Sequence, residues 1–242
     1  MCTLIIAWNP NSDCPLLVGA NRDENPNRHS EPWAFRESRV LCPIDVRGGT
    51  WIGINSSGVF AALTNLDQKS RADRGRHSRG HLVLQSLRCT SVEIAVAEVV
   101  KMMMKNIYNA FNLLIADRER MIAVIGYGPS RRMEMRPFDP GLHVATGWGV
   151  DNCKAERCKN IKAMIDKLPV GALPMKELLT IHGTDGTGTP KGAVCVHCKD
   201  FPHITRSSAI IRVKKDWSAV EVEHVECQPC KAERWNEMRM EL

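Results

Sequence analysis

The chain contains 242 residues, of which 43% are hydrophobic and 25% are charged, as is typical of a soluble globular protein with a sizeable core. Its net charge of +6 is spread along the sequence and only 5% of the residues are aromatic, whereas a nucleic-acid-binding surface needs a denser basic stripe with aromatic side chains. No apolar run approaches the roughly 18 residues of a membrane-spanning helix. These features argue against nucleic acid as a partner and against a transmembrane segment. The length suits one large domain or two small ones, and because the sequence shows no linker we expect one domain over residues 1–242.

The ten cysteines and the first residues indicate a reducing compartment. A disulfide scaffold would be shorter and richer in cysteine than this chain. The first apolar run is only about six residues long and lacks a preceding basic stretch, so we predict no signal peptide. We therefore expect a cytoplasmic protein with free thiols.

Residues 1–24 predict a β-hairpin, because two β-rich runs flank a polar turn. If the initiator methionine is removed, Cys2 carries both a thiol and a free α-amine. An α-amine has a reference pKa of about 8 and can accept the thiol proton. The hairpin brings the end of its second strand, around Asn21 and Asp23, close to Cys2. The alternative is that Cys2 is an ordinary buried cysteine.

A second hairpin is predicted over residues 48–65, where Gly58 suits a turn position with positive φ. The clearest helix spans residues 92–106, because Val92, Val99 and Met103 fall on one apolar stripe. Strands cluster at both ends of the chain with helices between them, and this order indicates an α+β fold in which helices cover two stacked, mainly antiparallel sheets. The remaining predicted elements are a loop at 25–37, helices at 80–89, 152–168 and 175–182, strands at 110–116, 121–127, 132–136, 142–146, 193–199, 207–213 and 219–225, and a charged C-terminal helix or tail.

Two cysteine pairs, Cys195 with Cys198 and Cys227 with Cys230, have the spacing of zinc ligands. A zinc ribbon needs each pair on a turn. The first pair instead falls in a predicted strand, where a three-residue separation points the side chains to opposite faces. We therefore do not expect zinc at these four cysteines. The glycine-rich segment 183–188 lacks the lysine and the following helix of a phosphate-binding loop, and we predict a surface loop there.

Short motifs then suggest a family. In order over nearly the whole chain they are Met1-Cys2-Thr3-Leu4, Ala20-Asn21-Arg22-Asp23-Glu24, Gly48-Gly49-Thr50-Trp51-Ile52-Gly53, Ala61-Ala62-Leu63-Thr64-Asn65, Arg79-Gly80-His81-Leu82-Val83, Asn109-Ala110-Phe111-Asn112-Leu113-Leu114, Ala193-Val194-Cys195-Val196 and Thr205-Arg206-Ser207-Ser208. Together they resemble the NRDE family, which is the family of the Transport and Golgi Organization 2 protein.

This resemblance implies a four-layer αββα fold of the N-terminal-nucleophile (Ntn) hydrolase type, in which two stacked sheets are flanked by helices. It also implies a cytosolic or mitochondrial role linked to haem trafficking and to acyl-CoA and lipid homeostasis. No cofactor is required for catalysis in this interpretation, and haem enters as a bound ligand. We expect Arg22 and His81 to bind the ligand.

A more distant likeness is to the cysteine Ntn acylases, the group of penicillin V acylase and bile salt hydrolase. The strand end Gly19-Ala20-Asn21-Arg22-Asp23 looks like their glycine-x-asparagine-x-aspartate pattern. The likeness implies Cys2 as nucleophile and Asp23 as the residue that holds its α-amine. It also implies Asn65 as an oxyanion-hole donor and Arg206 as a late active-site arginine.

The sequence departs from the acylase pattern at two points. The acylase arginine before the strand's asparagine is Ala20 here, and we expect Arg22 to point to the other face. The later threonine-asparagine pair of the oxyanion region reads Thr146-Gly147. A site without these groups is a poor catalyst, or a pocket that binds after catalysis was lost.

Two functions follow as hypotheses. The first is an Ntn-type pocket that binds haem or an acyl ligand. The second is an amidohydrolase or acyltransferase that uses Cys2 on an acylated small molecule. A module that only contacts other proteins is a third alternative, which we rank last because packing alone does not require Cys2 beside Asp23.

Overall fold

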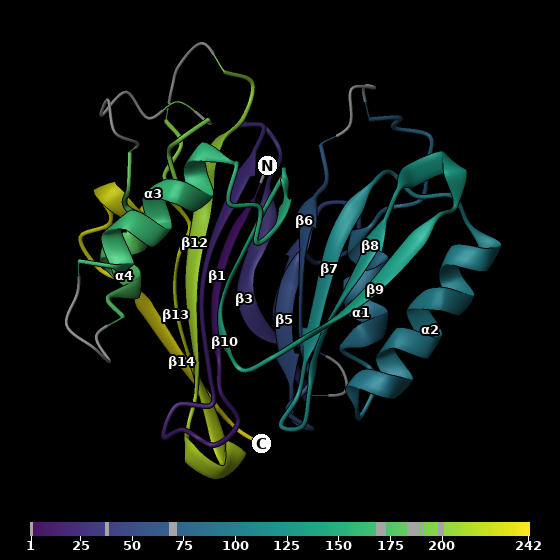
Figure 1. Ribbon diagram of the computed structural model, residues 1–242, viewed down its shortest axis with the longest axis horizontal. Helices are drawn as coiled ribbons and strands as arrows, with labels where there is room; N and C mark the ends of the chain where they lie inside the picture. Colours follow the sequence, from purple (N-terminus) through teal and green to yellow (C-terminus); the bar gives the residue numbers. More distant parts are fainter. Residues whose placement is uncertain are drawn as a thin grey trace.

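The computed structural model describes residues 2–36, 39–67, 72–167, 173–182, 189, 191–197 and 201–242. Two antiparallel seven-stranded sheets stack face to face, and helices cover their outer faces (Figure 1). Sheet A has the order β11-β10-β1-β2-β12-β13-β14, with β1 Thr3–Trp8, β2 Leu16–Glu24, β10 Gly141–Thr146, β11 Gly149–Val150, β12 Ile204–Val213, β13 Ala219–Val225 and β14 Asn236–Glu241. Sheet B has the order β3-β4-β5-β6-β7-β8-β9, with β3 Ser30–Arg36, β4 Val40–Asp45, β5 Ile52–Asn55, β6 Phe60–Asn65, β7 Phe111–Ala116, β8 Met121–Gly126 and β9 Met133–Phe138.

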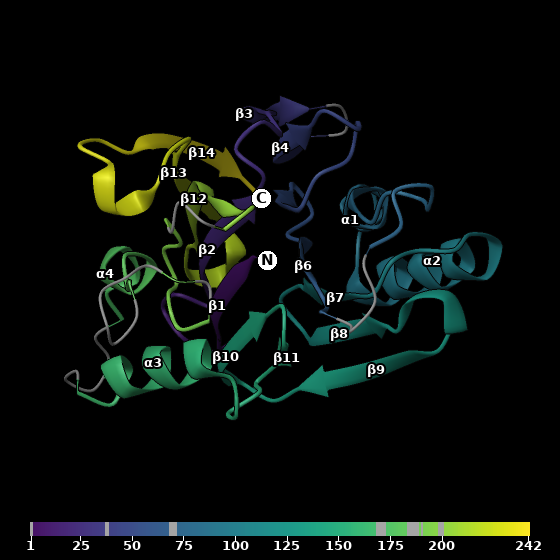
Figure 2. The same ribbon diagram turned by 90° about the horizontal axis from the view of Figure 1, so that it is seen from above.

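The helices lie on opposite outer faces, as the view from above shows (Figure 2). Helices α1 (Gly80–Ser86) and α2 (Val92–Lys105) cover sheet B, and α3 (Glu156–Ile165) and α4 (Met175–Leu179) cover sheet A. Three apolar clusters correspond to the three interfaces between layers. Each fully buried valine or leucine in them contributes about 1.5–3 kcal/mol, so these clusters are the main support of the fold. The predicted α+β fold with two stacked sheets is confirmed.

The predicted N-terminal hairpin is present, and its register separates the side chains into two sets. Strands β1 and β2 pair antiparallel with Leu4 opposite Ala20. These two residues face the core between the sheets, whereas Ile5 faces the helices outside sheet A. Because side chains alternate along a strand, every second residue of the hairpin faces inward.

The second hairpin and the long helix are also confirmed. Gly58 has a φ of +80° in the turn between β5 and β6, a conformation that favours glycine. Helix α2 begins after Ser91, whose hydroxyl accepts a hydrogen bond from the main-chain N–H of Ile94 at 3.4 Å. Glu93 in its first turn and Lys105 in its last turn complement the helix dipole.

Three predicted elements are wrong. Residues 30–36 of the predicted loop form β3, an edge strand that tolerates Pro32 because its outer side needs no partner for a main-chain N–H. The predicted C-terminal helix or tail contains β14, whose Met238 and Met240 alternate toward the core with the period of a strand. Residues 193–197 of the predicted strand at 193–199 are irregular, and the glycine-rich segment 183–188 lies outside the described residues. Within the described part of the chain, none of the helices has the length and apolar character to cross a membrane.

Candidate functional site

A cavity opens where several strands of the two sheets start or end. Cys2 immediately precedes β1, Arg22 lies near the end of β2, Asn65 ends β6 and Arg79 precedes α1. These residues meet because neighbouring antiparallel strands place the start of one beside the end of the next. We call this space the Cys2 cavity; its lining residues are Cys2, Arg22, Glu24, Arg28, Asp45, Arg47, Gly49, Thr50, Trp51, Leu63, Asn65, Arg76, His77, Ser78, Arg79, Gly80 and Asn109.

The Cys2 cavity has a volume of about 100 Å³. Pockets that bury a whole drug-sized ligand usually have roughly 300–1,000 Å³. The space therefore accommodates one small group, and the remainder of a larger ligand would lie outside its mouth.

Cys2 is 8% exposed at the wall of this cavity. Burial raises the pKa of its thiol, although the nearby Arg22 guanidinium and a main-chain hydrogen bond of Asp23 oppose that effect. The thiol is therefore protonated at neutral pH. To react as a nucleophile it needs a base that removes the proton.

A group of ion pairs forms one side of the cavity. Arg28 donates two hydrogen bonds to the Asp45 carboxylate, both at 2.9 Å, and Arg22 donates a third at 2.8 Å. Arg28 also pairs with Glu24 at 2.9 Å. Burial alone would raise the pKa of Asp45, but its hydrogen bond with Arg28 holds that pKa below the usual range. Burial alone would lower the pKa of Arg28, and the same hydrogen bond keeps it above its ordinary value. The two carboxylates are thus already engaged by these two arginines.

Arg79 differs from this group because its hydrogen-bond partner is a main-chain carbonyl rather than a carboxylate. Its Nη1 donates to the main-chain carbonyl of Ala110 at 2.8 Å. Among the described residues, no acidic side chain pairs with it. Burial lowers the pKa of Arg79 to about 10, so the guanidinium remains positive at neutral pH. A partly buried cation beside a small cavity favours an anionic ligand group.

The excess of positive charge extends over the whole cavity. Five arginines line it against two carboxylates, and Arg76 binds Asn109 Oδ1 at 3.2 Å in addition to Asp73. Arg47 is exposed at the lining. The cavity is therefore suited to carboxylate, phosphate or sulfonate groups rather than to cations.

The outer face of the same hairpin contains a different polar group. Arg157 from α3 donates to Thr3 Oγ1 at 2.7 Å and to Asp23 Oδ2 at 3.0 Å. Thr205 donates to Asp23 Oδ1 at 2.7 Å and accepts a hydrogen bond from the main-chain N–H of Val196 at 2.8 Å. The side chains of Arg157 and Asp23 are 0% and 2% exposed, so this ion pair is buried. The Asp23 carboxylate lies beside the start of β1 but does not line the Cys2 cavity.

The predicted site residues are only partly brought together. Asn65 and Arg22 line the cavity with Cys2, whereas Asp23 faces the opposite side of β2. His81 is exposed, lies outside the lining, and has its Nε2 at 3.3 Å from the Arg47 carbonyl oxygen.

Arg206 occupies the bulge of β12 where the pairing with β2 shifts, between the partners of Asp23 and Arg22. It does not line the Cys2 cavity. Its Nε is buried without a hydrogen-bond partner in the part of the chain that the structure describes. The bulge interrupts the alternation of side chains along β12 at Arg206, and no local sequence pattern predicted it.

The expectation that Arg22 points away from the face of Ala20 is wrong. Residues two apart on a strand share a face, so Arg22 lies on the inner side with Ala20, toward the cavity. Thr146 has a structural role beside this region, because its carbonyl accepts hydrogen bonds from Thr64 and Asn112, both at 3.2 Å. These bonds join sheet A to sheet B.

Of the cationic residues that line the cavity, sequence reasoning found Arg22 and missed the other four. Arg28 and Asp45 lie in or beside segments that were interpreted as loop. Arg79 belongs to a family motif in which His81, not Arg79, was expected to bind the ligand. The surplus of arginine over acidic residues in the segment 71–79 could have indicated an anion-binding site. The hydrogen bond of Arg79 to Ala110 could not be predicted, because Ala110 is distant in sequence.

Comparisons with known proteins agree with the motifs. The model of the family described as "Transport and Golgi organisation 2" (TANGO2) matches residues 1–224. The chain is 29% identical to the Transport and Golgi organization protein 2 homolog of Bos taurus in an alignment of 254 positions. This alignment covers 89% of this chain and 90% of the relative. It is 33% identical to the Homo sapiens homolog over 129 residues, which cover 48% of this chain and 45% of that protein.

Solved structures place the fold among Ntn hydrolases. A mutant of conjugated bile acid hydrolase from Clostridium perfringens superimposes with a TM-score of 0.56 at 12% identity, covering 99% of this chain and 92% of that chain. The N-acylethanolamine-hydrolyzing acid amidase ortholog of Caenorhabditis elegans superimposes with a TM-score of 0.59 at 11% identity, covering 100% of both chains. At these identities the likeness establishes the layered, Ntn-hydrolase-like fold.

Proposed function

Because the chain belongs to the Transport and Golgi organisation 2 (TANGO2) family, we propose that it binds the acidic end of a haem or an acyl-CoA in the Cys2 cavity. The observation that carries this proposal is the unbalanced charge of Arg79 at the cavity wall. Haem presents propionate carboxylates and acyl-CoA presents phosphates, and a guanidinium binds both kinds of group with charge-assisted hydrogen bonds. We place this activity in the cytosol or, in a eukaryote, in mitochondria.

The small volume of the cavity decides how such a ligand would bind. Only one charged group fits within about 100 Å³, so the porphyrin or the acyl chain would lie at the mouth. When haem is bound, it would supply an iron that takes thiolate or imidazole ligands. Cys2 and His77 are the lining residues that offer such donors, whereas His81 lies outside the lining.

A pair of titrations tests the proposal and separates the two ligands. Hemin binding is followed by absorbance and palmitoyl-CoA binding by calorimetry. The test variant is Arg79→Met, and Arg118→Met is the control, because Arg118 is exposed in a turn outside the cavity. A hydrogen bond to a charged group is worth about 1.5–3 kcal/mol, so Arg79→Met should weaken binding roughly 10- to 150-fold. Arg118→Met should bind like the wild type.

The two ligands give separable results. Saturable binding of only one of them, weakened by Arg79→Met, assigns the cavity to that ligand. Absence of saturable binding of both at micromolar concentration contradicts the proposal, and so does equal binding by wild type and Arg79→Met.

A second candidate function is acyl transfer or amide hydrolysis by Cys2, and it is favoured by the position of Asn65 on the wall of the same cavity. In this proposal the α-amine of Cys2 accepts the thiol proton, and the thiolate forms a C–S bond to the substrate carbonyl carbon. The leaving amine or thiol takes up a proton, and water then releases the acid and restores the thiol. The Asn65 amide would stabilise the oxyanion, with a typical loss of about 10²- to 10³-fold in rate when such a donor is removed. The acylase likeness would have Asp23 and Arg206 fix the amine and tune its charge, although neither side chain lines the cavity.

Intact mass distinguishes the two functions. If Met1 is retained, Cys2 has no α-amine and this second mechanism cannot operate. If Met1 is removed, incubation with an acyl thioester or a β-lactone should add the acyl mass to the wild type and not to Cys2→Ala. No adduct on the processed wild type contradicts the second function and leaves ligand binding as the activity of the cavity.

A further inference from the structure

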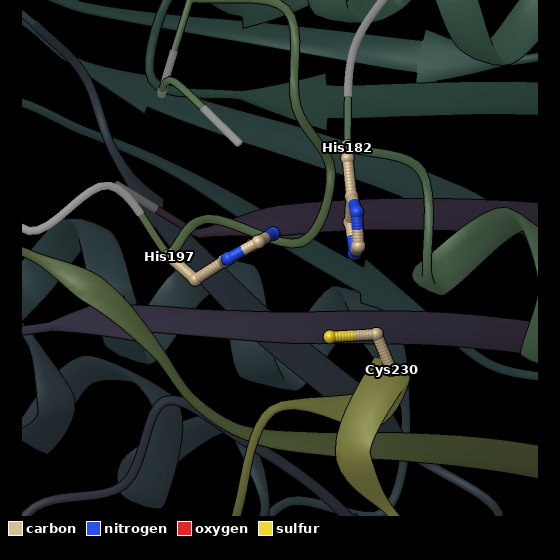
Figure 3. Close-up of side chains that lie close together, drawn as sticks. All are labelled: His182, His197 and Cys230. Carbon is tan, nitrogen blue, oxygen red and sulfur yellow. The ribbon is translucent and has the colours of Figure 1, made fainter. Parts of the chain in front are cut away.

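Three side chains that could bind a metal converge on the outer side of sheet A, away from the lining of the Cys2 cavity (Figure 3). His182 follows α4, His197 lies in the irregular segment before β12, and Cys230 lies in the 3-10 turn Pro229–Lys231. Their ligand atoms all lie within 4.8 Å of one another. The two imidazole rings are 4.3 Å apart at their centroids and inclined by 65°. We call these three residues the His182 cluster.

The imidazoles of this cluster lack the partners that buried polar atoms normally have. The Nε2 atoms of His182 and His197 are both buried, and neither has a hydrogen-bond partner among the described residues. A buried polar atom without a partner costs about 1–3 kcal/mol. Two such atoms beside one thiol are therefore unfavourable in the protein alone, and an ion between them would remove the cost for both.

We propose that the His182 cluster binds a zinc ion. Two imidazole nitrogens and one thiolate match the preference of zinc for nitrogen and sulfur ligands. With zinc bonds of about 2.0–2.3 Å, tetrahedral ligands lie roughly 3.3–3.8 Å apart. The present separations of up to 4.8 Å need only small side-chain rotations to close on an ion.

Cys195 supports the role of Cys230. Its thiol donates a hydrogen bond to the Cys230 sulfur at 3.5 Å. A hydrogen bond to the metal-binding sulfur stabilises the thiolate and orients it, as partners of metal ligands generally do. This ligand set differs from the four-cysteine set considered in the sequence analysis. It contains two histidines, and the exposed Cys227 is not a ligand.

The cluster lies where an ion would stabilise the outer layer. It joins the end of α4, the segment before β12 and the turn after β13. These segments also contact the hairpin, since Asn21 Nδ2 donates to the carbonyls of Leu179 at 2.8 Å and Val194 at 2.9 Å. Bound zinc would therefore tie the turn that contains Cys230 to the two segments that bond to β2, and it would stabilise this layer.

Metal analysis of the full-length protein purified without added metal tests this inference. We expect about one zinc per chain in the wild type and in the control variant Cys227→Ser, and a loss of most of it in His197→Ala and Cys230→Ser. A strong chelator should lower the Tm of the wild type and leave the Tm of the two site variants unchanged.

Cobalt substitution provides a readout that does not depend on the folding of the variants. The wild type loaded with Co²⁺ should show the visible bands of a four-coordinate site, with water as the fourth ligand, and a thiolate charge-transfer band. Three results would overturn the proposal: no zinc uptake by the wild type even with added Zn²⁺, zinc retained in both site variants, or a Cys195–Cys230 disulfide in protein purified without oxygen. Because neither hemin nor an acyl-CoA is used, the result is independent of the ligand of the Cys2 cavity.

Discussion

On its inner face the β1–β2 hairpin presents Cys2 and Arg22 to a small cavity, whereas on its outer face it presents Thr3 and Asp23 to the buried Arg157. Arg22 and Asp23 are neighbours in sequence, but the pleat of the strand sends them to opposite sides of sheet A. The inner arginines have access to a ligand. The outer arginine, Arg157 of α3, is 0% exposed and is bonded to Thr3 of β1 and Asp23 of β2.

The charged residues on the two faces of this hairpin therefore have separate roles. The outer ion pair positions the hairpin, since it joins α3 to both strands and Thr205 joins it to β12. On the inner side, Arg79 has no acidic partner among the described residues, so its charge is available for a ligand. Substitutions on the two faces should therefore affect different measurements.

The largest effect is expected on the outer face. Arg157→Met removes the cation of the buried pair while the Asp23 carboxylate stays buried. Breaking a buried pair in this way costs about 3–5 kcal/mol. The free energy of unfolding from urea titration should fall by that amount. The control is Arg120→Met, which removes an exposed pair with Glu93 and should change stability by at most about 1 kcal/mol. Similar small losses in both variants would remove the distinction between the faces.

An intermediate effect is expected for Asp45 on the inner face. Asp45→Asn removes the acceptor shared by Arg22 and Arg28, and we expect a loss of about 1–2 kcal/mol because the group is partly screened by solvent. The folded protein holds the pKa of Asp45 below its usual range, so its contribution is present at neutral pH and is lost as the pH falls below about 4.

Urea titrations at several pH values check this sign. The stability difference between wild type and Asp45→Asn should be constant from pH 7 to about 5 and should shrink at lower pH. A difference that grows on acidification would contradict the assignment of the Asp45 pKa.

A smaller effect is expected in the reactivity of Cys2. Burial raises the pKa of its thiol, so the thiolate fraction at pH 7.5 is low and alkylation by iodoacetamide should be roughly tenfold slower than at the exposed Cys153. The rate at Cys2 should continue to rise with pH above about 8.5, where an ordinary thiol begins to level off. Peptide mass spectrometry measures both rates in one sample. Faster labelling of Cys2 than of Cys153 at pH 7.5 would show that a neighbouring base lowers its pKa.

The smallest effect is expected for the stability of Asn65→Ala. Asn65 ends β6 at the cavity and is partly exposed, so its removal should change the free energy of unfolding by no more than about 0.5 kcal/mol. The urea midpoint measures this change. A loss above about 1.5 kcal/mol would make Asn65 a structural residue rather than a group available to a ligand or an oxyanion.

The sequence predicted the layers better than it predicted the site. Apolar periodicity located the hairpin at Cys2 and the helix at 92–106, because burial against a core imposes those periods. The edge strands β3 and β14 escaped the prediction. Each pairs with its neighbour in sequence, β4 and β13, but residues 30–36 contain Pro32 and residues 236–241 carry charges on one side, so neither shows the apolar run of a buried strand.

The site was harder to predict because it depends on long-range contacts. The motif around Arg79 indicated a family, but only the fold shows that Arg79 lines the Cys2 cavity with its guanidinium bonded to the Ala110 carbonyl. His197 lies within the cysteine motif at 195–198. It comes close to His182 because residues 193–197 are irregular, whereas a strand was predicted there. The face of Arg22 was available from strand alternation alone, and there the reasoning was at fault.

A crystal structure of the protein bound to palmitoyl-CoA or to hemin tests the central claim most directly. We predict an acidic oxygen of the ligand within hydrogen-bond distance of the Arg79 guanidinium, inside the cavity lined by Cys2 and Asn65. A ligand whose acidic groups lie outside that cavity, with Arg79 bonded only to the Ala110 carbonyl, would contradict the account.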